Sequence, residues 1–410
     1  MKKAPFLPAD ILIPNEEMSK WAVIACDQFT SDESYWSKVE SFVGESRSAL
    51  RITLPEIYLE KDNVDSRIAA VNETMKAYLD EGIFRTLENA FVYIERTQPD
   101  GRIRRGILGR VDLEEYDYRK GADTLVRATE GTVLSRIPPR VKIRRNAPLE
   151  LPHVMLLADD KENVLFATLD EKKDTFEKVY DFDLMMGGGH IVGYRLPADQ
   201  TERILAAQET LMGGKDNPLL FAVGDGNHSL ATAKECYTLL KQSIGEEKAK
   251  NHPARYALVE AVNIHDAALD FEPIYRVIFD CDTEELKKDL KAHFEAADNN
   301  AFFEYVTKEG REQIPMTLAE GQLIVGALQD YLDEWLKAHP AARVDYIHEE
   351  GETVALAQKD HAAGFLFTGM GKADLFPAVA ASGSLPRKTF SMGVSRDKRY
   401  YLEARRITEH

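Results

Sequence analysis

One stretch of the chain decides how its fold is read: residues 219–234, LLFAVGDGNHSLATAK. Residues 219–223 are apolar without a break, which is typical of a strand buried on both faces. Residues 230–234 are mostly good helix formers. The polar residues and glycines fall between these two runs, at 224–229. The sequence therefore predicts a strand that turns directly into a helix, with its polar side chains gathered at the joint.

This joint has the chemistry of a phosphate site. A helix N-terminus leaves its first amides unpaired and carries partial positive charge, and Gly226 lets the backbone approach a ligand closely. Asp225 can orient a group or bind Mg²⁺, and His228 can donate to a phosphoryl oxygen or move a proton. Asn227 and Ser229 can add hydrogen bonds. The simpler alternative is that Asn227 or Ser229 only caps the helix and Gly226 only makes the turn.

Working outward from the joint, strands and helices alternate irregularly along the chain. Strands are expected at 21–26, 90–94, 104–111, 154–157, 164–169, 191–195, 218–223, 257–264 and 362–367. Helices are expected at 65–79, 199–212, 228–240, 283–294 and 328–338. Residues 99–101, Pro-Asp-Gly, predict an antiparallel hairpin between the second and third strands. Because no long parallel alternation appears, the fold class is predicted to be α+β.

Composition restricts the classes of partner. The chain has 410 residues, of which 44% are hydrophobic and 30% charged, so it is predicted to be globular. Its formal charge of -17 argues against nucleic acid and anionic membranes as partners and favours a small molecule. No apolar run has the length of a membrane span, and the start lacks a signal-peptide core, so we expect a cytoplasmic protein. Its three cysteines are far apart, which argues against a disulfide framework or a zinc site.

Three further groups of residues are candidates for phosphate binding. Arg140 lies in a basic cluster with Arg136, Lys142, Arg144 and Arg145, although the alternation at 141–144 also fits the solvated face of a strand. Gly188, Gly189 and His190 could form an anion-binding nest, or only a loop with unusual backbone angles and a core histidine. Lys388 and Thr389 could bring a cation and a hydroxyl to the site, or remain solvated.

The chain resembles a known family, the bacterial and archaeal group labelled DUF1015, over nearly its whole length. The resemblance rests on several motifs together: CDQFTS at 26–31, LPE at 54–56, IPPR at 137–140, NAPLELPH at 146–153, DGNHS at 225–229 and LPRKTF at 385–390. Usual members of that family carry Asp-Gly-His-His-Arg at the joint and His-Glu-x-Thr before it. This pairing resembles the ParB/sulfiredoxin-type fold, which includes the free-serine kinases.

The resemblance implies roles for individual residues. Glu130 falls on the glutamate that acts as a base for the substrate hydroxyl, and Asp225, Gly226 and His228 fall on the phosphate-holding loop. Asn227 and Ser229 depart from the pattern, and Ser229 removes the arginine that clamps phosphate. We therefore expect either Arg140 or Lys388 to supply the missing positive charge, or a different substrate.

Together these arguments predict three regions: an N-terminal α+β region at 1–120, a ParB/sulfiredoxin-like core at 121–250 with an insertion between Glu130 and Asp225, and a C-terminal α+β region at 251–410. The expected activity is nucleotide-dependent phosphoryl transfer to or from a small hydroxyl metabolite such as serine, with Mg²⁺ at Asp225. Two rivals remain open: a nucleotide-sensing binding protein and a phosphate-ester hydrolase.

Overall fold

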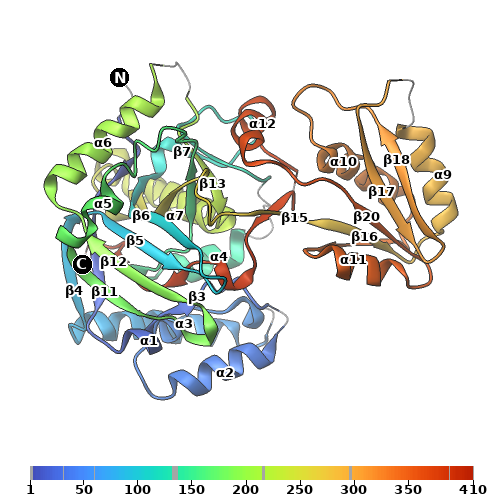
Figure 1. Ribbon diagram of the computed structural model, residues 1–410. Helices are drawn as coiled ribbons and strands as arrows, with labels where there is room; N and C mark the ends of the chain where they lie inside the picture. Colours follow the sequence, from blue (N-terminus) through green and yellow to red (C-terminus); the bar gives the residue numbers. More distant parts are fainter. Residues whose placement is uncertain are drawn as a thin grey trace. The chain divides into compact units, whose positions relative to one another are not determined.

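The computed structural model describes residues 3–30, 32–59, 61–131, 137–214, 218–294, 298–386 and 388–409 (Figure 1). The chain divides into two compact units. Unit 1 consists of Met1–Leu269 and Gly393–His410, and unit 2 of Asp270–Met392. The final segment of the chain, which follows unit 2 in the sequence, thus belongs to unit 1.

A ten-stranded sheet organises unit 1. Its strands lie in the order β11-β12-β5-β6-β14-β10-β13-β8-β7, and β1 pairs with β6. The bounds are β1 Phe6–Leu7, β5 Val92–Thr97, β6 Ile103–Asp112, β7 Tyr116–Asp117, β8 Val126–Ala128, β10 Met155–Ala158, β11 Glu177–Asp183, β12 His190–Arg195, β13 Phe221–Asp225 and β14 Tyr256–Asn263. Most neighbours are antiparallel, whereas β10 with β14, β13 with β8, and β7 with β8 are parallel.

The sheet separates two hydrophobic cores, as the alternation of side chains along β5 shows. Val92 and Ile94 belong to one core, and Phe91 and Tyr93 belong to the other. The first core is closed by α2 and α3, and the second by α6 and α7 (Figure 1). The helices of unit 1 are α1 Met18–Trp21, α2 Glu33–Val43, α3 Val64–Asp80, α4 Ile137–Arg144, α5 Leu169–Lys172, α6 Ala198–Met212, α7 Asn227–Ile244 and α8 Glu246–Ala249.

Short strand pairs attach the ends of unit 1 to this framework. β2 pairs with β4, β22 with β3, and β23 with β9. Their bounds are β2 Ala9–Pro14, β3 Val23–Ile24, β4 Phe84–Ala90, β9 Leu149–Glu150, β22 Tyr400–Tyr401 and β23 Arg405–Arg406. The last two pairs fix the C-terminal segment to the first unit.

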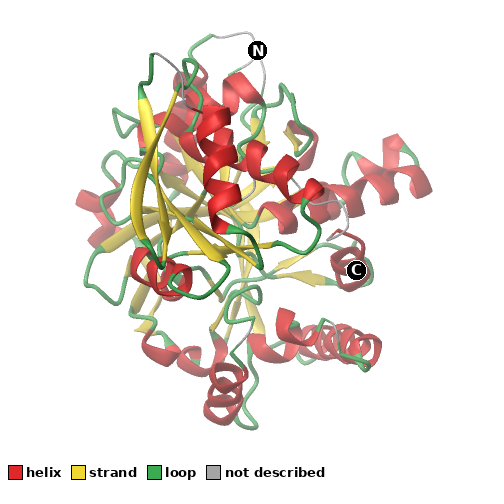
Figure 2. Ribbon diagram, turned by 90° about the vertical axis from the view of Figure 1, so that its right-hand side faces the viewer, coloured by secondary structure: helices red, strands yellow, loops and turns green. Residues whose placement is uncertain are grey.

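Unit 2 has its own five-stranded sheet, ordered β18-β17-β20-β16-β19. Helices α9 and α10 pack on one face and α11 on the other (Figure 2). The bounds are β15 Phe271–Pro273, β16 Tyr275–Phe279, α9 Thr283–Phe294, β17 Ala301–Thr307, β18 Gly310–Met316, α10 Ile324–Ala338, β19 Arg343–Ile347, α11 Glu350–Ala357, β20 Ala362–Leu366, α12 Leu375–Ser382 and β21 Phe390–Met392. Strand β15, at the entry to the unit, pairs with β21 at its exit.

One strand expected from sequence is absent, and the segment at 141–144, whose alternation also fits the face of a strand, is helical; each difference has a physical cause. Residues 141–144 lie in helix α4, whose prolines occupy the first turn, where no N–H is needed. Residues 164–169 form turns and the start of α5. The buried Asp160 carboxylate accepts from the amides of Val164 and Leu165 at 2.8 and 2.7 Å, and Arg203 donates to both carbonyls. The backbone groups that a strand would pair are therefore occupied.

The α+β class is confirmed, and the predicted hairpin forms between β5 and β6. The stretch expected to be a strand at 21–26 is shorter: Trp21 ends helix α1, and only Val23–Ile24 pair. The three expected regions do not coincide with the two units, because strands from 92–112, 126–225 and 256–263 share one sheet. None of the described helices has the length and apolar character needed to cross a membrane.

Candidate functional site

The polar joint lies between β13 and α7, as the sequence indicates. Gly226 makes the turn with φ of 80°, a left-handed conformation that glycine adopts without strain. A Cβ at this position would lie 3.0 Å from Cα of Val154, so any side chain would crowd the neighbouring backbone. The Asp225 carboxylate accepts from the Gly226 amide at 3.1 Å. The joint is thus a tight turn that presents the start of an 18-residue helix.

Glu130 lies at the same edge of the sheet as Asp225. Strands β8 and β13 are parallel, with Ala128 opposite Val223, so Glu130 and Asp225 each follow the paired position by two residues. Thr129 connects the two strand ends: its amide donates to Oδ1 of Asn227 at 3.2 Å, and Nδ2 of Asn227 donates to its hydroxyl oxygen at 3.2 Å. Asn227 therefore ties the joint to the segment that carries Glu130. His228 is half-buried on the first turn of α7.

The cation at this joint is Lys398, which the sequence analysis missed. Its ammonium lies 3.4 Å from Oδ2 of Asp225, and both side chains are largely buried. Lys398 belongs to the C-terminal segment of unit 1, and no spacing rule connects it with residue 225. Two neighbouring charges at 396 and 397 make it appear in the sequence as part of a solvated run.

Two buried arginines hold the segment that carries Lys398. Arg96 donates to the carbonyls of Arg396 and Lys398 at 2.9 and 3.2 Å, and to the carbonyl of Gly188 at 3.0 Å. Arg104 donates to the carbonyl of Asp397 at 2.7 Å. Burial lowers the pKa of Arg96 to about 10. We call residues 396–398, with their two arginine contacts, the C-terminal strap.

The structure does not place the 188–190 residues on the Asp225 joint. They precede or begin β12, and strands β5, β6, β14 and β10 lie between β12 and β13. A Cβ at Gly189 would meet the carbonyl oxygen of Thr97 at 2.0 Å, which explains the glycine by packing. His190 is bonded to the carboxylates of Asp183 and Asp181 at 2.7 and 2.8 Å. Arg96 connects Gly188 with the C-terminal strap, which carries Lys398 to the joint.

Of the two cations expected from sequence, Arg140 has another partner and Lys388 belongs to the other unit. Arg140, on α4, forms an ion pair with Glu56. Lys388 is exposed and lies with Thr389 in unit 2, where the Thr389 hydroxyl donates to the carbonyl of Pro386 at 2.7 Å. Arg136 of the basic cluster lies outside the described residues.

A second polar group surrounds the buried His153, beside the first turn of α7. Its Nε2 lies 3.0 Å from Oγ of Ser229, and its Nδ1 lies 2.8 Å from the hydroxyl oxygen of Tyr401. The Tyr401 hydroxyl donates to Sγ of Cys26 at 3.0 Å. Oδ2 of Asp27 lies 3.8 Å from Nε2. His153, Ser229, Tyr401 and Cys26 border a cavity of about 150 Å³.

Burial and charge act in opposite directions on the acids of this group. Burial raises the pKa of the Cys26 thiol to about 12, with a further contribution from the Asp27 carboxylate, so the thiol stays protonated. Burial alone would also raise the pKa of Asp27, but His153 and a hydrogen bond from Gln28 lower it on balance. The Asp27 carboxylate is therefore ionised beside the His153 ring.

The side chains at Asp225 do not fit a resident Mg²⁺. The ammonium of Lys398 lies against the carboxylate oxygen that a metal would take. Among the residues that the structure describes, no group of three His, Cys, Asp or Glu side chains could hold a metal ion. Mg²⁺ usually binds through one or two carboxylates together with substrate phosphates. Any Mg²⁺ at this joint would have to arrive with a ligand's phosphates.

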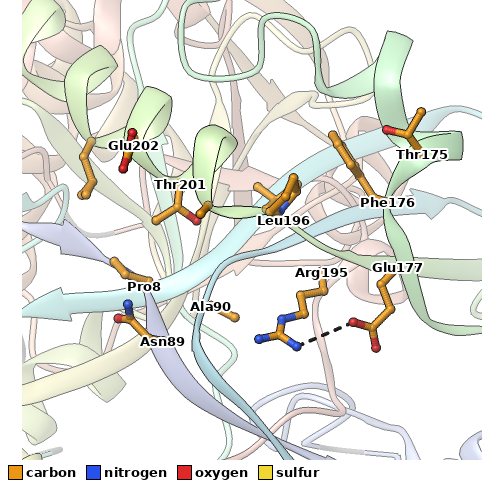
Figure 3. A pocket seen from close by; sticks show the side chains of 13 residues that line it. Pro8, Asn89, Ala90, Thr175, Phe176, Glu177, Arg195, Leu196, Thr201 and Glu202 are labelled. Atoms are coloured by element: carbon orange, nitrogen blue, oxygen red, sulfur yellow. Dashed lines mark ion pairs between the residues drawn. The ribbon is translucent and has the colours of Figure 1, made fainter.

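A larger hollow of about 560 Å³ lies at a different part of unit 1 and contains none of the expected site residues. It is bordered by the start of α6, with Thr201 and Glu202, and by the ion pair of Arg195 and Glu177 at 3.7 Å (Figure 3). No feature of the Asp225 joint extends to it.

Several solved structures resemble the chain at low sequence identity. A free serine kinase in complex with AMP matches with a TM-score of 0.40 and 12% identity, covering 72% of this chain and 90% of its own. A conserved hypothetical protein from Pyrococcus furiosus matches with a TM-score of 0.38 and 12% identity, and the match covers 71% of this chain and 92% of its own. SbnI from Staphylococcus aureus, with a C-terminal truncation, matches with a TM-score of 0.36 and 9% identity, and the match covers 70% of this chain and 83% of its own.

With TM-scores below 0.5, these likenesses are distant. No curated protein matches the sequence. A family profile described as "Protein of unknown function (DUF1015)" matches residues 6–360, which is most of the chain. The motifs and the profile agree, and the chain belongs to the DUF1015 family.

Proposed function

We propose that the chain is a phosphotransferase that moves a phosphoryl group between a nucleotide and a small hydroxyl metabolite, with the phosphate held at the joint of β13 and α7. The observation that carries this proposal is the pair of Asp225 and Lys398 at the N-terminus of α7, beside the strand end that bears Glu130. A buried cation and a helix N-terminus can stabilise the charge of a phosphoryl group, and a carboxylate can act as the base for its acceptor.

Each residue has a role in this proposal. The first amides of α7 and the ammonium of Lys398 stabilise the negative charge that spreads over the phosphoryl oxygens in the transition state. Lys398 has three N–H donors, so it can keep its contact with Asp225 and still donate to a phosphate. Gly226 lets the phosphate approach the backbone, and Asn227 fixes the loop to Thr129.

Glu130 is the proposed base for the acceptor. As the acceptor oxygen forms its bond to phosphorus, its proton passes to the Glu130 carboxylate, and the bond between phosphorus and the nucleotide's leaving oxygen breaks. His228, on the first turn of α7, is the proposed donor of a hydrogen bond or a proton to a phosphoryl oxygen. Serine is the proposed acceptor because the family resemblance implies it.

Two variants test this assignment. A thermal-shift screen of nucleotides and phosphorylated metabolites, with and without Mg²⁺, first identifies a ligand, because a ligand of the native state raises Tm. Asp225→Asn should then weaken binding of that ligand and reduce turnover. Glu130→Gln should bind it normally and lose about 10²–10⁴-fold in rate. Titration calorimetry and a product assay compare the two.

The same measurements separate the rival functions. Ligand binding without any product in the wild-type protein would favour a nucleotide sensor. Release of inorganic phosphate without an acceptor would favour hydrolysis. Normal turnover by Glu130→Gln would contradict the base role of Glu130. An unchanged ligand affinity in Asp225→Asn would contradict the proposal that the phosphate binds at the joint.

A further inference from the structure

Ser229 and His153 have the geometry of a nucleophile and its base. Oγ of Ser229 lies 3.0 Å from Nε2 of His153, within the range in which an imidazole removes a hydroxyl proton during attack. The two residues come from different parts of the chain, since Ser229 is on the first turn of α7 and His153 lies two residues before the start of β10. The phosphate chemistry proposed at Asp225 and Lys398 leaves this pair unused.

A third residue orients the imidazole. The Tyr401 hydroxyl donates its proton to Sγ of Cys26 at 3.0 Å, so its oxygen accepts from Nδ1–H of His153 at 2.8 Å. This leaves Nε2 without a proton and able to accept from the Ser229 hydroxyl. Burial raises the pKa of Tyr401, which keeps the phenol protonated. The ionised Asp27, 3.8 Å from Nε2, stabilises the imidazolium that forms when the proton is transferred.

The adjoining cavity has the size and lining for a small uncharged group. Its volume of about 150 Å³ is comparable with that of a cavity that binds benzene. Leu54, Ile143, Val154 and Leu258 are among the apolar residues that border it. Its two arginines are neutralised by ion pairs, Arg140 with Glu56 and Arg144 with Glu150. A neutral acyl group fits this lining better than a phosphoryl group does.

We infer that Ser229 is a nucleophile activated by His153, and that the cavity takes the acyl group of a small carboxylic ester. Oγ of Ser229 forms a bond to the carbonyl carbon while its proton passes to Nε2, and the bond to the alcohol breaks as that alcohol takes the proton. Water then attacks the acyl-serine with His153 again as base, which releases the acid and restores Ser229. The positive end of the helix dipole of α7 stabilises the oxyanion.

Covalent labelling of the full-length protein tests this inference. A fluorophosphonate probe, followed by intact-mass measurement and peptide mapping, should add one label, on Ser229. Hydrolysis of p-nitrophenyl acetate should show a burst and fall about 10²-fold or more in Ser229→Ala. The matched control is Ser243→Ala, an exposed serine on the same helix, which should retain both labelling and rate.

Tyr401→Phe tests the positioning role of the phenol. Loss of the acceptor for Nδ1–H should lower kcat for p-nitrophenyl acetate with little change in KM, while circular dichroism shows an unchanged fold. The inference is overturned if the wild-type protein takes no label, if the label maps to another residue, or if folded Ser229→Ala hydrolyses the ester at the wild-type rate.

Discussion

At the scale of single residues, Lys398 supplies the positive charge beside the Asp225 carboxylate. The position where the family pattern has an arginine holds Ser229, and Arg140, one of the two cations expected to replace it, forms an ion pair with Glu56. A lysine from the other end of the chain provides the charge instead. It is buried with its carboxylate, so removing one partner leaves the other without compensation.

We predict that Lys398→Met lowers the free energy of unfolding by about 1–3 kcal/mol, because the buried Asp225 loses its cationic partner. Adding Asp225→Asn should restore part of that loss, since an amide needs no counter-charge. Both proteins should bind the phosphate ligand at least about tenfold more weakly. Urea unfolding and calorimetry measure these effects. Normal ligand affinity in Lys398→Met would contradict the role of this lysine.

Glu150 is a second residue whose charge state affects stability. Burial alone would raise its pKa, but Arg405 and Arg144 lower it on balance below its usual value. Because the folded-state pKa is depressed, this carboxylate stabilises the fold fully above the unfolded pKa of about 4.3. That contribution is lost as the pH falls through the depressed value.

We therefore expect Glu150→Gln to be less stable than the wild type at pH 7, because two buried arginine contacts lose their charged partner. The difference in unfolding free energy should shrink as the pH is lowered below about 4.3. Urea unfolding of both proteins from pH 7 to pH 3.5 measures it. A difference that stays constant over this range would show that the ionised carboxylate is not what stabilises the site.

At the scale of elements, the C-terminal strap determines where Lys398 can lie. Arg96 alone bonds three carbonyls from two separate segments, and Arg104 bonds a fourth. These carbonyls receive donors from side chains rather than from a strand ladder. The strap is consequently held by the two arginines of the β5–β6 hairpin.

We predict that Arg96→Met lowers the free energy of unfolding by about 3 kcal/mol, since it leaves buried carbonyls without donors. It should also weaken phosphate binding at Asp225, because Lys398 loses its support. Hydrogen exchange should increase at residues 396–398. The control is Arg102→Met at the tip of the same hairpin, where an exposed pair with Asp100 contributes little. Equal effects of the two substitutions would argue against a specific role for Arg96.

At the scale of the whole molecule, unit 2 is an insertion into unit 1. The chain leaves unit 1 at Leu269 and returns at Gly393. Phe271 and Met392 are paired on β15 and β21, so the two ends of unit 2 are adjacent. Unit 2 also has its own core, formed by its sheet with α9 and α10. These are the properties of a separately folding domain.

We predict that a protein of residues 270–392 folds alone, with one cooperative thermal transition. A second protein, in which 272–391 are replaced by a short Gly-Ser linker, should keep the fold of unit 1, because the linker only spans paired strand ends about 5 Å apart. Circular dichroism and calorimetric melting of both proteins test this. A non-cooperative melt of residues 270–392 would contradict it.

The sequence by itself determined the features that depend on neighbours along the chain. The apolar run before Asp225 and the helix formers after Ser229 predicted the strand-to-helix joint, and the Pro-Asp-Gly turn predicted the β5–β6 hairpin. Local patterns fail where distant groups occupy the backbone. The apolar run at 164–169 forms no strand, because Asp160 and Arg203 bond the amides and carbonyls of its first two residues, Val164 and Leu165.

Only the tertiary structure decided which residues from distant segments meet. The parallel pairing of β8 with β13 brings Glu130 to the edge of the sheet that carries Asp225. The hydrogen bond between Thr129 and Asn227 at this edge joins residues that are 98 positions apart in the sequence. The return of the chain after unit 2 brings Lys398 to Asp225 and Tyr401 to His153. Such meetings depend on sheet order and on burial of the whole chain, which no local periodicity encodes.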